Sequence, residues 1–161
     1  SPLERDNFSF FMEGLECLIK QKRCHRQGRD ALVVYADMNN LKIINDRYGH
    51  EEGDFSLKVI ADRLAGAAGK DGVAGRIGGD EFAYVCPYDG SDGGLETLAA
   101  LYAAFQSFNE GTDKVYNVTI SAGACVVKPD SGMTLEEALS VADEQLYEVK
   151  KLRSKEVAKG V

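Results

Sequence analysis

The sequence lacks long hydrophobic runs and any regular cysteine pattern. No window holds the roughly 18 uninterrupted apolar residues that a membrane span requires, and the first residues show no signal-peptide pattern. The four cysteines include no C-x-x-C pair, so neither a zinc site nor a disulfide framework is indicated. We therefore expect a cytoplasmic domain with free thiols and no direct membrane insertion.

Positive charge is scarce relative to negative charge. The 161 residues include 26 acidic and 19 basic side chains, which gives a formal net charge of −7. Such a chain repels a phosphate backbone, and this argues against nucleic acids and anionic membranes as partners. If the protein handles phosphate groups, we expect metal ions to mediate the contact.

Common phosphate-binding and calcium-binding motifs are also missing. The chain contains neither G-x-x-x-x-G-K-[ST] nor G-x-G-x-x-G. A calcium EF-hand loop that begins at Asp37 fails, because its fifth and sixth positions require an oxygen ligand and a glycine and are Leu41 and Lys42 here. Any phosphate or metal site must therefore be of another kind.

Hydrophobic periodicity predicts an alternation of helices and strands in a single domain. Helices are expected at residues 8–19, in a short segment from Leu41, and at 57–68, 95–108 and 134–151. Strands are expected at residues 31–37, 73–77, 82–86 and 116–127. The central β-α-β-β-α-β order predicts an α+β, ferredoxin-like fold, with helices packed on one side of the sheet and additional N-terminal and C-terminal helices.

The stretch "GRIGGDEFAY" (75–84) places two glycines and two acids between two predicted strands. A hairpin turn of type I′ or II′ explains one glycine, and the second lets a ligand lie directly against the main chain. In the ferredoxin-like topology the first strand runs antiparallel to the third, which brings Asp37 to Asp80 and Glu81. Three carboxylates in one place predict a divalent metal site. By itself, the glycine-acid cluster is weak evidence for such a site and is more typical of an ordinary solvated turn.

The segment "ADMNNLKIINDRYGHEEGD" (36–54) follows the first predicted strand. We expect a short helix from Leu41, so that the main-chain amides of residues 39–42 point toward the metal. These amides, with the positive charge of Lys42, would form an anion site.

Four blocks in the correct order make the chain resemble the GGDEF diguanylate cyclase family, whose members condense two GTP into cyclic di-GMP. The blocks are "DMNNLKIINDRYGHEEGD" (37–54), "GGDEF" (78–82), "SAGA" (121–124) and "ADEQLYEVKK" (142–151). The resemblance extends from about residue 3 to residue 151. It implies a GTP substrate, Mg²⁺ ions, expected as a pair with Mn²⁺ as an alternative, and a second copy of the domain as partner.

The resemblance also implies roles for individual residues. Asp37, Asp80 and Glu81 would be catalytic, and these carboxylates with the Met38 carbonyl would hold the metal ions. Asn45 and Asp54 would pair with the guanine edge, which would discriminate against adenine. The remaining substrate contacts would be made by Asn40, Leu41, Lys42, Gly78, Gly79 and Lys150.

The two guanine-contacting residues have simpler alternative interpretations. Asn45 and Asp46 are short polar residues that suit the end of a helix. Asp54 is a good N-cap for the helix that follows it, and this role is compatible with guanine binding.

The chain departs from the family pattern at three places. The opening block is reduced to Leu3 and Arg5, and Ser154 stands where a triphosphate-binding arginine is expected. The motif R-x-x-D of the inhibitory product site is absent, so we expect no such site. The resemblance implies a diguanylate cyclase that is active as a symmetric dimer and belongs to a longer chain with an upstream regulatory region. The alternative is a GTP-binding or dimerising regulatory module that has lost turnover.

Overall fold

The computed structural model describes residues 28–159, which form four strands and four helices. The predicted first helix at residues 8–19, and the family-like Leu3 and Arg5, lie outside the described residues. The described elements are β1 (Asp30–Met38), α2 (Leu41–Tyr48), α3 (His50–Ala68), β2 (Val73–Arg76), β3 (Glu81–Tyr88), α4 (Leu95–Gly111), β4 (Ile120–Val127) and α5 (Leu135–Lys159).

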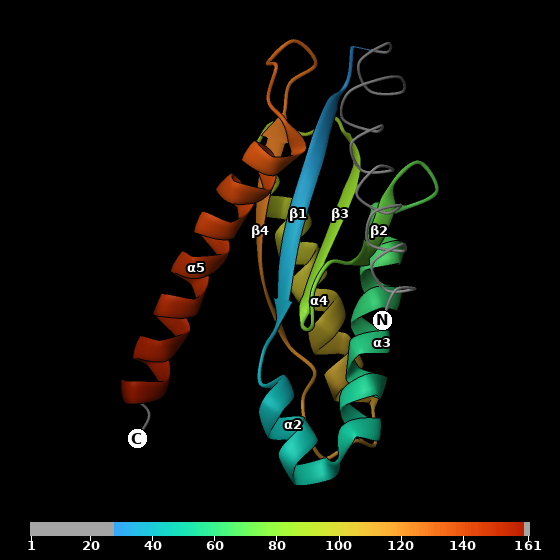
Figure 1. The fold of residues 1–161 in the computed structure, drawn as a ribbon, viewed down its shortest axis with the longest axis vertical. Helices are drawn as coiled ribbons and strands as arrows, with labels where there is room; N and C mark the ends of the chain where they lie inside the picture. The colour runs from blue at the N-terminus through green and yellow to red at the C-terminus, as the bar shows by residue number, and fades with distance from the viewer. Residues whose placement is uncertain (1–27, 160–161) are drawn as a thin grey trace.

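The strands form one antiparallel sheet in the order β2-β3-β1-β4. This is the ferredoxin-like arrangement that the periodicity predicts, and β1 lies between β3 and β4 as expected. Helices α3 and α4 pack on one face of the sheet, whereas the additional helix α5 packs on the opposite face (Figure 1).

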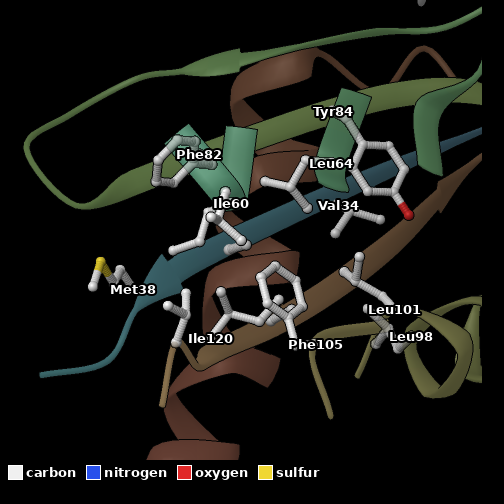
Figure 2. Close-up of a cluster of buried hydrophobic side chains, with 14 of the residues drawn as sticks. Val34, Met38, Ile60, Leu64, Phe82, Tyr84, Leu98, Leu101, Phe105 and Ile120 are labelled. Atoms are coloured by element: carbon white, nitrogen blue, oxygen red, sulfur yellow. The ribbon is translucent and has the colours of Figure 1, made fainter. Parts of the chain in front are cut away.

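Alternating side chains of β1 explain why the sheet is covered on both faces. Leu32, Val34 and Met38 are buried against α3 and α4, while Ala31 and Val33 are buried against α5. Figure 2 shows the larger of these two cores, in which Phe82 and Tyr84 of β3 meet side chains from the helices. The helical members labelled there are Ile60, Leu64, Leu98, Leu101 and Phe105.

Helix α5 approaches the sheet closely. Its first turn is capped by Thr134, whose hydroxyl accepts a hydrogen bond of 3.1 Å from the amide of Glu137. A Cβ atom at Gly123 of β4 would lie 1.9 Å from the carbonyl oxygen of Ala142 in α5. Glycine at this position therefore sets how near α5 can lie to β4. In the described part of the chain, no helix combines the length and apolar character of a transmembrane span.

Candidate functional site

The end of β1 and the turn between β2 and β3 meet, as the topology predicts. Asp37 is the register partner of Glu81, and the amide of Met38 donates a hydrogen bond of 2.8 Å to the carbonyl oxygen of Asp80. Residues more than forty positions apart are thus joined by main-chain contacts. This confirms the predicted convergence of Asp37, Asp80 and Glu81.

The β2–β3 turn is wider than a two-residue hairpin. The last ladder pair joins Arg76 to Phe82, and residues 77–80 connect the end of β2 to the start of β3. The guanidinium of Arg76 donates to the carbonyl oxygens of Gly78 at 2.9 Å and Gly79 at 2.6 Å. Neither glycine has a positive φ. The prediction of a type I′ or II′ turn was therefore wrong, because the longer loop closes without left-handed residues.

The two glycines of this turn have different surroundings. A Cβ atom at Gly78 would lie 2.5 Å from the Oε2 atom of Glu81, so glycine leaves room for that carboxylate. A Cβ atom at Gly79 would meet nothing within 4 Å among the residues described. The fold itself does not require glycine at position 79, and the open space there fits a ligand that lies against the main chain.

Asp37 is a largely buried carboxylate with one neutralising partner. Its side chain is 14% exposed, and its Oδ2 atom accepts a hydrogen bond of 2.6 Å from the ammonium group of Lys150. Burial raises the pKa of Asp37, and the negative charge of Asp80 raises it further, while Lys150 opposes both effects. Within residues 28–159, the Oδ1 atom of Asp37 has no hydrogen-bond partner although it is buried. A buried carboxylate oxygen without a partner fits a position beside a cation.

The third predicted carboxylate, Glu81, lines the same pocket as Tyr35 and Asp37. Burial and the nearby Glu81 carboxylate raise the pKa of Tyr35. In the described part of the chain, no group of three or more His, Cys, Asp or Glu side chains is arranged to hold a metal ion. Asp37, Asp80 and the carbonyl of Met38 therefore stay a predicted donor set for a cation, in which Asp37 supplies a buried oxygen without a partner in the described residues.

A pocket of about 620 Å³ opens beside these residues, between the sheet and α5. Its lining includes Tyr35, Asp37 and Glu81 from the strands and Asp143 and Lys150 from α5. Sequence reasoning missed Tyr35 as a member of the site. Its position two residues before Asp37 was the available signal, because residues two apart on a strand share a face.

Asn45 and Asp54 lie on two helices that pack together. A Cβ atom at Gly53 would lie 1.8 Å from the Oδ1 atom of Asn45, so the side chain of Asn45 stands directly against α3. Helix α2 continues to Tyr48, and α3 begins at His50. Asn45 therefore does not end a helix and Asp54 is not an N-cap, so both simpler alternatives were wrong. Asp54 is exposed, whereas Asn45 is partly buried.

The start of α2 is only partly available as an anion site. The amide of Asn39 donates a hydrogen bond of 2.9 Å to the carbonyl oxygen of Thr119, so its predicted role as a ligand donor was wrong. Asn40 precedes the helix with a φ of 63° and makes no side-chain cap. The amides of Leu41 and Lys42 lie in the first turn, where helices leave their N–H groups without internal partners.

Lys42, another predicted substrate contact, lies at an exposed position of α2. The side chain of Lys42 is 88% exposed, and its ammonium lies 3.8 Å from the carboxylate of Asp46, one turn along α2. Ser154 lies within α5, and its side chain is outside those described.

Residues of the "SAGA" block (121–124) in β4 contact elements that form the site. The Ser121 hydroxyl donates a hydrogen bond of 3.0 Å to the Asn39 side chain, which in turn donates to the hydroxyl of Thr119 at 3.2 Å. These contacts hold the connection between β1 and α2. Gly123 of the same block gives α5 its close approach, and α5 carries Lys150 to Asp37.

Known proteins resemble this chain over most of its length. The sequence model of the family described as "Diguanylate cyclase, GGDEF domain" matches residues 6–156. An uncharacterised 19.3 kDa protein of Streptomyces ambofaciens is 35% identical over 78% of this chain and 66% of its own length. The diguanylate cyclase DgcP of Pseudomonas aeruginosa is 33% identical over 80% of this chain and 19% of its own length. The chain thus spans less than two thirds of the length of each of these relatives.

Solved structures agree in fold. The GGDEF domain of PA1120 from Pseudomonas aeruginosa matches with a TM-score of 0.71 and 26% identity, over 89% of each chain. The GGDEF domain of DgcB from Caulobacter crescentus, solved in complex with c-di-GMP, matches with a TM-score of 0.73 and 24% identity, over 89% of this chain and 84% of that one. Together with the family match over most of the sequence, these findings show that the chain belongs to the GGDEF domain family of diguanylate cyclases.

Proposed function

We propose that this chain condenses two GTP molecules into cyclic di-GMP and releases pyrophosphate, with Mg²⁺, at the interface of two copies of the domain. The observation that carries the proposal is the pair Asp37 and Asp80 beside an open glycine turn. The buried carboxylate has one oxygen neutralised by Lys150 and another without a partner in the described residues. A negatively charged triphosphate with its cations fits such a place.

The proposed reaction forms two phosphodiester bonds. In each, the 3′-hydroxyl oxygen of one GTP attacks the α-phosphate of the other, the bond between the α- and β-phosphates breaks, and pyrophosphate leaves. Bound Mg²⁺ would offset the charge of the triphosphate and favour ionisation of the 3′-hydroxyl. Because each domain presents one nucleotide, two domains must face each other across a twofold axis.

Residues of this chain would bind and orient the nucleotide. Asn45 and Asp54 would hydrogen-bond the guanine edge from α2 and α3, and the bare main chain at Gly79 would lie along the phosphates. The ammonium of Lys150, on α5, is within reach of the same place through its contact with Asp37. Glu81, which lines the same pocket as Tyr35, would act as a further metal ligand or as the acceptor of the 3′-hydroxyl proton.

A regulatory module without turnover is the second candidate. Ser154 stands where the family pattern has a triphosphate-binding arginine, and this observation favours weaker retention of the phosphates. Both candidates bind guanine nucleotides with Mg²⁺, and only the first one makes product.

The deciding experiment uses the chain fused to a parallel coiled coil, so that two domains are held together. Incubation with GTP and Mg²⁺ should give one cyclic di-GMP for every two pyrophosphates. Asp80→Asn in the same fusion should reduce product by about 100-fold or more, whereas Asp62→Asn, on the exposed side of α3, should leave the rate unchanged. GTP binding without product would favour the regulatory module.

A further inference from the structure

The connection between α4 and β4, residues 112–119, contacts both ends of α2. At its C-terminal end, Thr119 accepts the amide hydrogen bond of Asn39, which immediately precedes the left-handed Asn40. In its middle, the ring of Tyr116 packs against the ring of Tyr48, the last residue of α2. The two ring centroids lie 5.2 Å apart with an interplanar angle of 32°. This connection therefore braces α2 at its start and at its end.

The same connection holds the first turns of α3. The Tyr116 hydroxyl donates a hydrogen bond to the carboxylate of Glu52, and the ammonium of Lys114 donates to that carboxylate at 3.0 Å. Lys114 also lies 4.6 Å above the ring centroid of Phe55. The Tyr116 hydroxyl and the Lys114 ammonium lower the pKa of the Glu52 carboxyl, so both contacts favour its charged form. Tyr116 thus joins the end of α2 to the beginning of α3 through one side chain.

The two helices held by Tyr116 are those that carry the proposed guanine contacts. Glu52 precedes Gly53 and Asp54 directly, and Asn45 stands against Gly53 across the helix pair. The distance between α2 and α3 therefore sets the distance between Asn45 and Asp54. Recognition of a guanine edge depends on that spacing, because misplaced donors and acceptors are left unpaired.

We infer that Tyr116 is a positioning residue for guanine recognition, which fixes the spacing of α2 and α3 through its ring on Tyr48 and its hydroxyl on Glu52. The inference rests on the proposed function, because it assigns to Asn45 and Asp54 the binding of the base. Tyr116 itself does not touch the nucleotide. Its removal affects base recognition and leaves phosphate binding intact.

The test compares Tyr116→Phe with Tyr88→Phe in the full 161-residue chain. Tyr88 offers a matched control, because its hydroxyl also donates to a carboxylate, that of Asp92, in the connection before α4. Calorimetric titrations with Mg²⁺ present would use three probes, namely GTP, ATP and inorganic triphosphate. Tyr116→Phe should weaken GTP binding by about fivefold and leave triphosphate binding unchanged. Tyr88→Phe should leave the affinities for all three probes unchanged.

A second measurement reports on the helices directly. Without nucleotide, amide hydrogen exchange across residues 45–53 should be faster in Tyr116→Phe than in the wild type and unchanged in Tyr88→Phe. If Tyr116→Phe does not fold, as judged by circular dichroism, Lys114→Met removes the other partner of Glu52 and carries the same expectation.

The outcomes separate this inference from the proposed function. A wild-type chain that binds GTP no better than ATP would overturn the proposed guanine site. A wild-type chain that prefers GTP, with a Tyr116→Phe variant whose GTP affinity stays within about twofold, would overturn the role of Tyr116 alone. Equal weakening of GTP and triphosphate binding would also overturn it, because the effect would then not act through the base.

Discussion

At the level of single residues, the two glycines of the β2–β3 turn have separate reasons to be there. Gly78 makes space for the Glu81 carboxylate, whereas Gly79 faces open space and has no positive φ. A requirement of the fold therefore accounts for the first glycine and not for the second. We propose that approach of a ligand accounts for Gly79.

This difference predicts the effect of Gly79→Ala. The unfolding free energy should stay the same or rise by about 0.5 kcal/mol, because alanine fits the backbone and restricts the unfolded chain. GTP binding should weaken by about tenfold, because the methyl group occupies the space of the ligand. Denaturant unfolding and calorimetry measure the two effects.

Gly66→Ala is the matched control, since a Cβ atom at Gly66 also meets nothing within 4 Å of the described residues. It lies inside α3, and alanine there should stabilise the helix without changing GTP affinity. Unchanged GTP binding in Gly79→Ala would refute the ligand-approach explanation.

Individual residues also show which contacts of the site could be predicted from the sequence and which could not. The meeting of Asp37 with Asp80 follows from strand order alone, so it was predictable. The hydrogen bond that occupies the amide of Asn39, and the contact between Tyr35 and Glu81, depend on exact register and loop path. Periodicity fixes which face a side chain occupies but not which partner it finds there.

At the level of elements, the apolar pattern predicted the existence and order of the described strands and helices. It did not predict where α3 begins. The polar stretch before Phe55 has no apolar periodicity, yet α3 starts at His50 because a single residue, Gly49 with a φ of 97°, separates it from α2. A helix boundary set by one positive-φ glycine leaves no trace in the hydrophobic pattern.

The close contact between α5 and β4 predicts that Gly123→Ala is strongly destabilising. The added methyl group would meet the main chain of α5, which cannot move without displacing the whole helix. We expect a loss of about 3 kcal/mol of unfolding free energy, measured by urea unfolding. Gly111→Ala at the end of α4, where a Cβ atom is free of contacts in the described chain, serves as the control. A loss no larger than that of the control would contradict this account of α5 docking.

The contact of Glu52 with Tyr116 and Lys114 predicts a pH dependence of stability. These partners lower the pKa of Glu52 in the folded state, so their stabilising effect is complete above the pKa of the unfolded chain. It is lost as the pH falls through the folded-state pKa. The stability difference between wild type and Tyr116→Phe should therefore shrink between about pH 5 and about pH 3.

Urea unfolding at a series of pH values measures this difference. Tyr88→Phe provides no neutral reference here, because Asp92 has a lowered pKa of its own and should behave in the same way. Lys42→Met, which removes only an exposed pair with Asp46, is the suitable reference. A difference that stays constant down to about pH 3 would show that the Glu52 charge does not contribute.

At the level of the whole molecule, each copy carries a formal net charge of −7. Two copies that face each other, as we propose, therefore repel at long range. Salt weakens this repulsion, because the screening length falls from about 30 Å at 0.01 M to about 8 Å at 0.15 M. The encounter of two domains should therefore limit the rate of product formation by the unfused chain.

We predict that the rate of cyclic di-GMP formation per unfused domain rises with domain concentration and, at constant Mg²⁺, with added salt. Product assays across a dilution series measure both effects. The coiled-coil fusion is the control, and its rate per domain should not depend on concentration. A rate per unfused domain that is independent of concentration would contradict the requirement for two copies.

The hydrogen bonds of Arg76 to the β2–β3 turn also orient the N–H groups of that turn. In a trans peptide, the carbonyl and the following N–H point in opposite directions. By drawing the carbonyl oxygens of Gly78 and Gly79 to itself, the guanidinium turns the N–H groups of Gly79 and Asp80 away from it. One arginine thereby orients two hydrogen-bond donors that it never touches, and the donors are in place before any anion arrives.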